Sequence, residues 1–186
     1  EFKTSAYLAD KLEAMGYKVT RNIGGTGVIG EIKGSEPGPV MMLRADMDAL
    51  PFLIDGEKKN IHACGHDAHS AMLLAAASEL VGKVKRGTLR ILFQQGEETL
   101  KGALAVIDAG VIEDVDIALG LHIRPVQDIA YGEMSPAVRH ASSTFVNVVI
   151  NGLSSHGARP HLGVNAIEAA AVAINAITAI KINPII

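Results

Sequence analysis

The sequence is poor in cysteine, in net charge and in long apolar runs, and each shortage excludes a class of protein. One cysteine among 186 residues cannot form an internal disulfide and is compatible with a reducing compartment. A net charge of −3 without a basic run gives no electrostatic footprint for nucleic acid or an anionic membrane. No stretch approaches the ~20 apolar residues of a membrane span, and EFKTSAYLADKLEAMG is amphipathic rather than signal-like. We therefore expect a cytoplasmic protein with no membrane and no nucleic-acid partner.

The chain alternates between helix-like and strand-like segments. Apolar spacing predicts helices over 2–15, 68–81, 100–109 and 164–180. Short apolar runs predict strands over 17–20, 27–32, 40–45, 88–93, 117–121 and 143–150. Alternating strands and helices are typical of an α/β fold with parallel strands, in which ligands bind at the carboxyl ends of the strands. The polar residues that follow these strands are Asp46, Asp48, Glu97, Glu98 and His122.

The pattern changes after about residue 139. The strand 143–150, the polar loop 151–163 and the apolar helix 164–180 together predict the start of a second domain. We therefore predict a catalytic domain over 1–139 and the beginning of another domain over 140–186.

Gly25, Gly27 and Gly30 spell the G-x-G-x-x-G pattern of dinucleotide-binding proteins. Such a loop must follow a strand and open a helix, whose N-terminus holds the pyrophosphate. Here the glycines lead into VIGEIKGSEPGP, which is typical of a strand and then a loop. We therefore interpret them as a glycine-rich hairpin that binds no dinucleotide.

The segment IHACGHDAHS, residues 61–70, holds three of the seven histidines and the only cysteine. Thiolate, imidazole and carboxylate groups are ligands for zinc, manganese and cobalt. Cys64 and His66 are two residues apart, so both can point one way from a loop. Glu97 and Glu98 follow a strand, where one carboxylate can bind metal while the other acts as a base. His122 is a further candidate, and the convergence of these residues on strand ends predicts a metal site.

Five motifs in order resemble those of the metal-dependent amidohydrolases, a family of N-acyl-amino-acid amidohydrolases, hippurate hydrolases, auxin-conjugate hydrolases and related carboxypeptidases. The motifs are RADMDALP (44–51), HACGHDAH (62–69), FQQGEE (93–98), GLH (120–122) and SSHGARPHLGVNAI (154–167). The resemblance implies a zinc-peptidase-like α/β catalytic domain whose mixed, largely parallel sheet is flanked by helices. It also implies the start of an α+β ferredoxin-like lid that usually dimerises, and two divalent metal ions (Zn, Mn, Co or Ni).

The resemblance assigns roles to single residues. The matched metal ligands are Cys64, which would bridge the two ions, His66, Glu98 and His122. Glu97 matches the general base, and Asp46 matches an acidic residue that supports the metal centre from behind its ligands. His156 matches a lid histidine that reaches the active site of a neighbouring subunit. His62 and His69 match no ligand, and we interpret them as structural.

The implied reaction is hydrolysis of an amide bond in an N-acyl amino acid or short peptide by a metal-activated water, in a homodimer or higher homo-oligomer. Two alternatives stay open. One is a hydrolase that uses Cys64 as its nucleophile, and the other is a non-catalytic metal-binding or ligand-binding relative.

The sequence departs from the family pattern at three points. Gln95 and Gly96 stand where the family commonly has Pro and Ala, and the connection 51–60 is shorter than usual. The last metal-ligand histidine of the family lies far downstream, in a C-terminal return to the catalytic domain. This chain ends before that point, so we expect a fragment that lacks one ligand and most of the lid.

Overall fold

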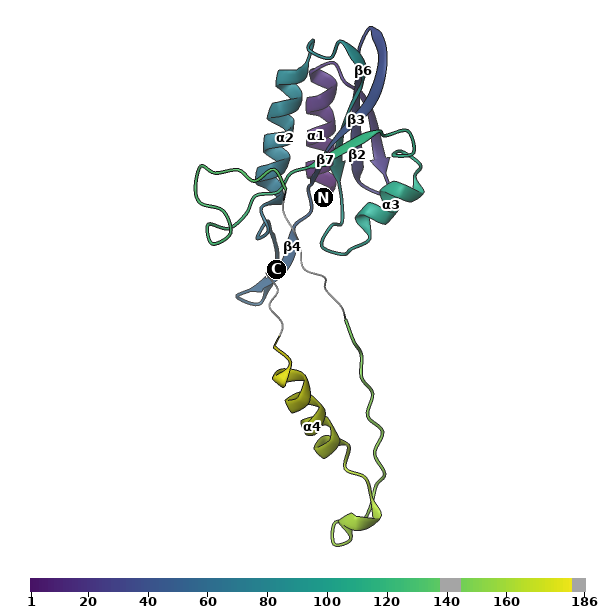
Figure 1. Cartoon of the computed structure of the whole chain (residues 1–186), viewed down its shortest axis with the longest axis vertical. Helices are drawn as coiled ribbons and strands as arrows, with labels where there is room; N and C mark the ends of the chain where they lie inside the picture. The colour runs from purple at the N-terminus through teal and green to yellow at the C-terminus, as the bar shows by residue number, and fades with distance from the viewer. Residues whose placement is uncertain (138–144, 182–186) are drawn as a thin grey trace. The chain divides into compact units, whose positions relative to one another are not determined.

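The computed structural model describes residues 1–137 and 145–181, and the chain forms two compact units, Glu1–Tyr131 and Gly132–Ile186 (Figure 1). The predicted boundary between residues 139 and 140 lies outside the described residues and stays a prediction. Each unit is described separately below.

A five-stranded sheet forms the centre of the first unit. Its strands, in the order β1-β2-β6-β3-β7, are β1 (Lys18–Ile23), β2 (Gly27–Lys33), β6 (Arg86–Gln94), β3 (Glu36–Asp46) and β7 (Ile117–Gly120). β2 is antiparallel to β1 and β6, whereas β3 is parallel to β6 and β7. Asp46 is paired with Gln94, so the last residues of β3 and β6 lie side by side. The expected mixed α/β class is confirmed, and the parallel strands share one carboxyl edge.

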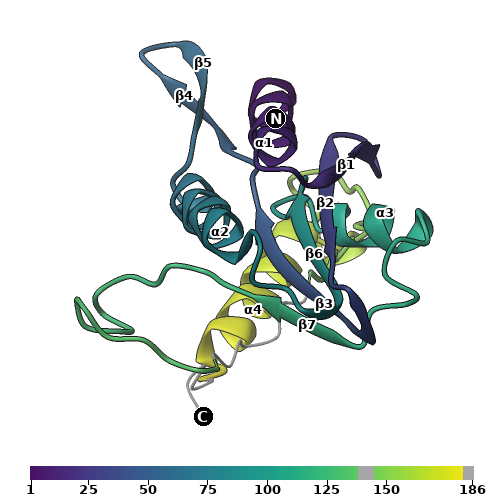
Figure 2. The same ribbon diagram turned by 90° about the horizontal axis from the view of Figure 1, so that it is seen from above.

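Helices cover both faces of this sheet. α1 (Phe2–Ala14) and α2 (His66–Leu80) lie on one face, and α3 (Gly102–Asp108) lies on the other (Figure 2). Side chains alternate along β6, so that Ile91 and Phe93 pack with α1 and α2, while Leu92 packs with Val106 of α3. Burial of each large apolar side chain contributes roughly 1.5–3 kcal/mol. Two apolar layers therefore fix the sheet between the helices.

A hairpin that we did not predict follows β3. Its strands, β4 (Leu50–Ile54) and β5 (Glu57–Ile61), pair with each other in a separate two-stranded sheet (Figure 2). Asp55 and Gly56 form the turn, with φ of 51° and 79°. An Asp-Gly pair with two positive φ angles is a recognised hairpin signal. The strands themselves are largely exposed and lack alternation, which is why apolar periodicity gave no indication of them.

The G-x-G-x-x-G pattern lies in a β-hairpin, as expected. β2 begins at Gly27 and pairs with β1, and no helix follows the glycines. A Cβ atom on Gly30 would lie 2.9 Å from Cδ1 of Leu12. The absence of a side chain at position 30 therefore allows α1 to pack closely against the sheet.

The second unit contains the short helix η1 (Pro160–Leu162) and the helix α4 (Ala166–Ala179). The side chain of Asn165 caps α4 by accepting a hydrogen bond from the backbone N–H of Ile167 at 3.0 Å. The expected strand 143–150 is wrong over its described part, because residues 145–150 have no strand partner there; its first two residues lie outside the described ranges. No helix in the described parts of the chain combines the length and hydropathy needed to cross a membrane.

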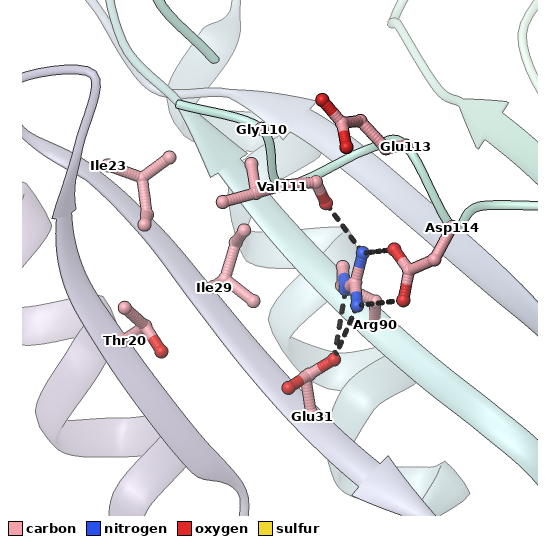
Figure 3. Close-up of a pocket in the computed structure, with 9 residues that line it drawn as sticks. All are labelled: Thr20, Ile23, Ile29, Glu31, Arg90, Gly110, Val111, Glu113 and Asp114. Carbon is pink, nitrogen blue, oxygen red and sulfur yellow. Dashed lines mark hydrogen bonds and ion pairs between the residues drawn. The ribbon is translucent and has the colours of Figure 1, made fainter. Parts of the chain in front are cut away.

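Arg90 of β6 is buried in an ion-pair network on the α3 face (Figure 3). Its Nη2 lies 2.8 Å from Oε1 of Glu31, the residue of β2 that is paired with it. Its Nη1 lies 2.6 Å from Oδ1 of Asp114. It also donates to the carbonyl of Val111. The hydrogen bond with Asp114 raises the pKa of Arg90 and lowers the pKa of Asp114. The network borders a cavity of about 290 Å³ and ties the segment after α3 to the sheet.

We expect Arg90→Met to lower the free energy of unfolding by about 3 kcal/mol, because it leaves the largely buried carboxylate of Glu31 without its partner. Arg86→Met removes an exposed guanidinium from the same strand and should change stability by less than about 0.5 kcal/mol. Chemical denaturation of both variants measures the difference. Equal losses in the two variants would contradict a stabilising role for the network.

Candidate metal centre

The candidate site lies at the carboxyl ends of the three parallel strands, beside the start of α2. Its side chains come from the end of β3, the turn after β6, the segment after β7 and the loop that enters α2, and they are Asp46, Glu97, Glu98, His122, Cys64 and His66. Gly65, between Cys64 and His66, has φ of +81°, and a Cβ atom there would lie 2.2 Å from the side chain of Ile123. Only glycine fits this tight entry into the helix.

His66 stands at the centre of the cluster. Its side chain is 1% exposed, and its Nε2 has no hydrogen-bond partner. This atom lies 3.8 Å from Oε1 of Glu98 and 3.9 Å from Oε2 of Glu97. Oε1 of Glu98 is also buried without a partner. Burial of unpaired polar atoms is costly, and a cation between these two atoms would satisfy both.

Asp48 holds two of the ligand-bearing segments together. Its Oδ1 accepts a hydrogen bond from Nδ1 of His66 at 2.9 Å, and its Oδ2 accepts one from the backbone N–H of Glu98 at 3.0 Å. With its proton on Nδ1, neutral His66 keeps the Nε2 lone pair free for a metal. The sequence places Asp48 after a strand without indicating its role. The D-x-D spacing with Asp46 was the available signal, since alternate residues of an extended chain share a face.

Asp46 is held from several directions. Nε2 of His69 donates to its Oδ1, and Nη1 of Arg44 lies 2.7 Å from its Oδ2. Burial by itself raises the pKa of Asp46, but the hydrogen bond from His69 and the charge of Arg44 outweigh it, so that the pKa falls to about 2. Asp46 is therefore ionised at neutral pH, and His69 is fully buried behind the cluster. The position of Asp46 suits its expected role in supporting the metal centre, and the position of His69 suits a structural role.

Cys64 faces His122 across the site, with its Sγ 3.6 Å from Nε2 of the ring. Nδ1 of His122 donates to the carbonyl of Ile123, which leaves the Nε2 lone pair toward the sulfur. Burial, and then the carboxylates of Glu98 and Glu97, raise the pKa of the Cys64 thiol. A nucleophilic cysteine requires nearby positive charge instead. These surroundings disfavour the cysteine-nucleophile alternative and favour a cation that would stabilise the thiolate.

The donor atoms form three overlapping groups, and within each group they lie within 4.8 Å of one another. The groups are Cys64 with His66 and His122, His66 with Glu97 and Glu98, and Asp46 with His66 and His69. Thiolate, imidazole and carboxylate donors in such proximity suit a divalent transition metal. The first two groups together contain all four expected ligands, and their donors fit a centre for two ions.

His156 belongs to the second unit and lies in an exposed turn. The backbone N–H of Ala158 donates to its Nδ1 at 3.1 Å. Because Nδ1 accepts this bond, the neutral ring carries its proton on Nε2. His156 therefore presents a hydrogen-bond donor at its exposed end.

Comparison with known proteins decides the family. The sequence profile described as Peptidase family M20/M25/M40 matches residues 42–181. The chain belongs to this family. The resemblance inferred from the five motifs is thereby confirmed.

Two curated relatives and one solved structure illustrate the M20 relationship. Thermostable carboxypeptidase 2 of Saccharolobus solfataricus is 38% identical over 200 residues, which span 100% of this chain and 51% of that protein. The N-acyl-L-amino acid amidohydrolase of Geobacillus stearothermophilus is 37% identical over 183 residues, which span 90% of this chain and 48% of that protein. A dinuclear metal-binding M20 peptidase of Bacillus subtilis has a TM-score of 0.62 and 37% identity, over 67% of this chain and 38% of its own. The chain thus spans about half the length of the curated relatives it matches.

Proposed function

We propose that the full-length protein is a metal-dependent hydrolase that cleaves the amide bond of N-acyl amino acids or short peptides. One observation carries the proposal: Nε2 of His66 and Oε1 of Glu98 are buried, lack hydrogen-bond partners and lie 3.8 Å apart among other donors. The names of the relatives, a carboxypeptidase and an N-acyl-L-amino acid amidohydrolase, support the reaction and the substrate class.

The ions and the protein would divide the chemistry between them. Two divalent ions would be held by Cys64, His66, Glu98 and His122, and His66 belongs to both donor groups. When bound, such ions lower the pKa of water and polarise the amide carbonyl. Glu97 would remove the proton from the attacking water as the C–O bond forms, and would then deliver that proton to the amine nitrogen as the C–N bond breaks. Asp48 binds the backbone N–H of Glu98 and the ring of His66, and it thereby holds these two ligands in a fixed position relative to each other.

His156 would complete the site of a neighbouring subunit. Its exposed position and the proton on its Nε2 suit a donor to the oxyanion that develops on the substrate carbonyl. This role requires a homodimer or higher homo-oligomer assembled through the second unit. For the ions themselves, the mixed thiolate, imidazole and carboxylate donors support Zn, Mn, Co or Ni. A single cysteine, which cannot form an internal disulfide, supports a cytoplasmic location.

Metal analysis and a substrate panel on the full-length protein test this function. We expect two ions per subunit, hydrolysis of N-acyl amino acids or dipeptides, and loss of both on chelation with recovery on metal addition. Bound metal without turnover on the panel would indicate a non-catalytic relative. Turnover that survives chelation but stops on alkylation of Cys64 would establish the cysteine-nucleophile alternative.

Cys64 gives a separate prediction. In the metal-loaded protein its thiolate should resist iodoacetamide, and after chelation it should react, since coordination occupies the sulfur lone pairs. Mass spectrometry of the intact protein measures the labelling. Cys64→Asp should retain part of the activity because a carboxylate can also bridge two ions, whereas Cys64→Ala should lose more. Fast labelling of the metal-loaded enzyme with matching loss of activity would refute the ligand role.

A further inference from the structure

The turn that carries the two glutamates is anchored to the glycine hairpin by one side chain. Gln95, which is 7% exposed, donates from its Nε2 to the carbonyl of Gly24 in the β1–β2 turn at 2.7 Å. The amide Oε1 makes no hydrogen bond among the described residues, so the donor Nε2 provides the bond. A Cβ atom on Gly27 would lie 2.6 Å from that Oε1. The absence of a side chain at position 27 therefore makes room for Gln95.

The surrounding backbone leaves this turn little freedom. Gly96 has φ of +59°, a conformation that glycine adopts most easily. Its carbonyl accepts a hydrogen bond from the backbone N–H of Gly102 at 3.0 Å. A Cβ atom on Gly102 would lie 1.7 Å from the carbonyl oxygen of Gln95, and one on Gly24 would lie 2.8 Å from Ala105 of α3. The β1–β2 hairpin, the turn that carries Glu97 and Glu98, and α3 therefore pack closely against one another at positions occupied by glycine.

We propose that Gln95 is a positioning residue for Glu97 and Glu98. The turn is held at one end by the bond from Gln95 to Gly24 and at the other by the bond from the N–H of Glu98 to Asp48. A proline at position 95, the residue common in the family, would offer neither a side-chain donor nor the reach to Gly24. In this chain a side-chain hydrogen bond therefore sets where the two carboxylates stand. The inference rests on the proposed metal-dependent function.

Gln95→Met and Gln95→Glu in the full-length protein test the anchor. Methionine keeps the length of the side chain without a donor, and an ionised glutamate keeps the shape but faces the carbonyl of Gly24 with an acceptor. We expect both variants to lose roughly 10- to 100-fold in Co²⁺ affinity and in kcat, with little change in KM, as for other residues that orient metal ligands. The d–d absorption spectrum of bound Co²⁺ should change as well, since it reports ligand geometry.

Val106→Ala is the matched structural control. It removes buried apolar volume from the side of α3 that packs on the sheet, and it should lower the thermal unfolding midpoint while leaving Co²⁺ affinity, spectrum and kcat near wild type. Gln95 variants that match this control in all three readouts would overturn the positioning role while the proposed function stands. A wild-type protein that binds no Co²⁺ or other divalent ion would overturn both proposals.

Discussion

Replacement of Glu97 by glutamine in the full-length protein should lower kcat by about 10²- to 10⁴-fold and leave the metal content near wild type. Glu97 lies among the ligands, with its Oε2 3.9 Å from Nε2 of His66, and it is more exposed than Glu98, as expected of a group that faces substrate. Glutamine keeps the shape of the side chain but cannot accept the proton of the attacking water. Steady-state kinetics and metal analysis of one preparation measure both effects.

Glu98→Gln is the matched partner of that variant. The substitution removes one negative charge from the position next to Glu97. Oε1 of Glu98 is buried and lacks a hydrogen-bond partner. We therefore expect loss of bound metal, with activity restored in part by excess metal. Equal loss of metal in both variants, or a fully active Glu97→Gln, would reverse or remove the assignment of base and ligand.

His156→Ala should lower kcat by about 10²- to 10³-fold, the usual effect of losing one donor to a developing oxyanion. Metal content and the thermal unfolding midpoint should stay near wild type, because His156 is exposed and its side chain bonds only to the backbone of its own turn in the described structure. His161→Ala, an exposed histidine five positions further along the same segment, is the control and should retain activity.

Mixed subunits test whether His156 acts across an interface. His156→Ala and Glu97→Gln proteins, each inactive alone, should recover about a quarter of wild-type activity when their subunits exchange. Statistical mixing makes half of the dimers hybrid, and each hybrid has one complete site. Differently tagged chains verify the exchange. Verified hybrids without activity would refute the cross-subunit role, and a fully active His156→Ala would refute any catalytic role.

Much of the site could be predicted because its signals are local in sequence. Cys64 and His66 are two residues apart, Glu97 and Glu98 are adjacent, and each group follows a recognisable strand or precedes a recognisable helix. Strands in an α/β fold bring their carboxyl ends to one edge, so the convergence of these groups followed from the order of elements. The structure does bring the six predicted residues of the first unit together, and the hairpin interpretation of the glycines was correct.

Contacts between distant segments could not be predicted in the same way. The sequence by itself determined the order of the helices and of the five strands of the main sheet in the first unit, the donor chemistry and the family, because periodicity, spacing and motifs are properties of neighbouring residues. Only the tertiary structure decided that Asp48 reaches both His66 and Glu98, 18 and 50 residues away, and that Gln95 reaches Gly24, 71 residues away. Such bonds depend on strand order and on glycines that permit close approach, and these arise when the sheet packs against its helices.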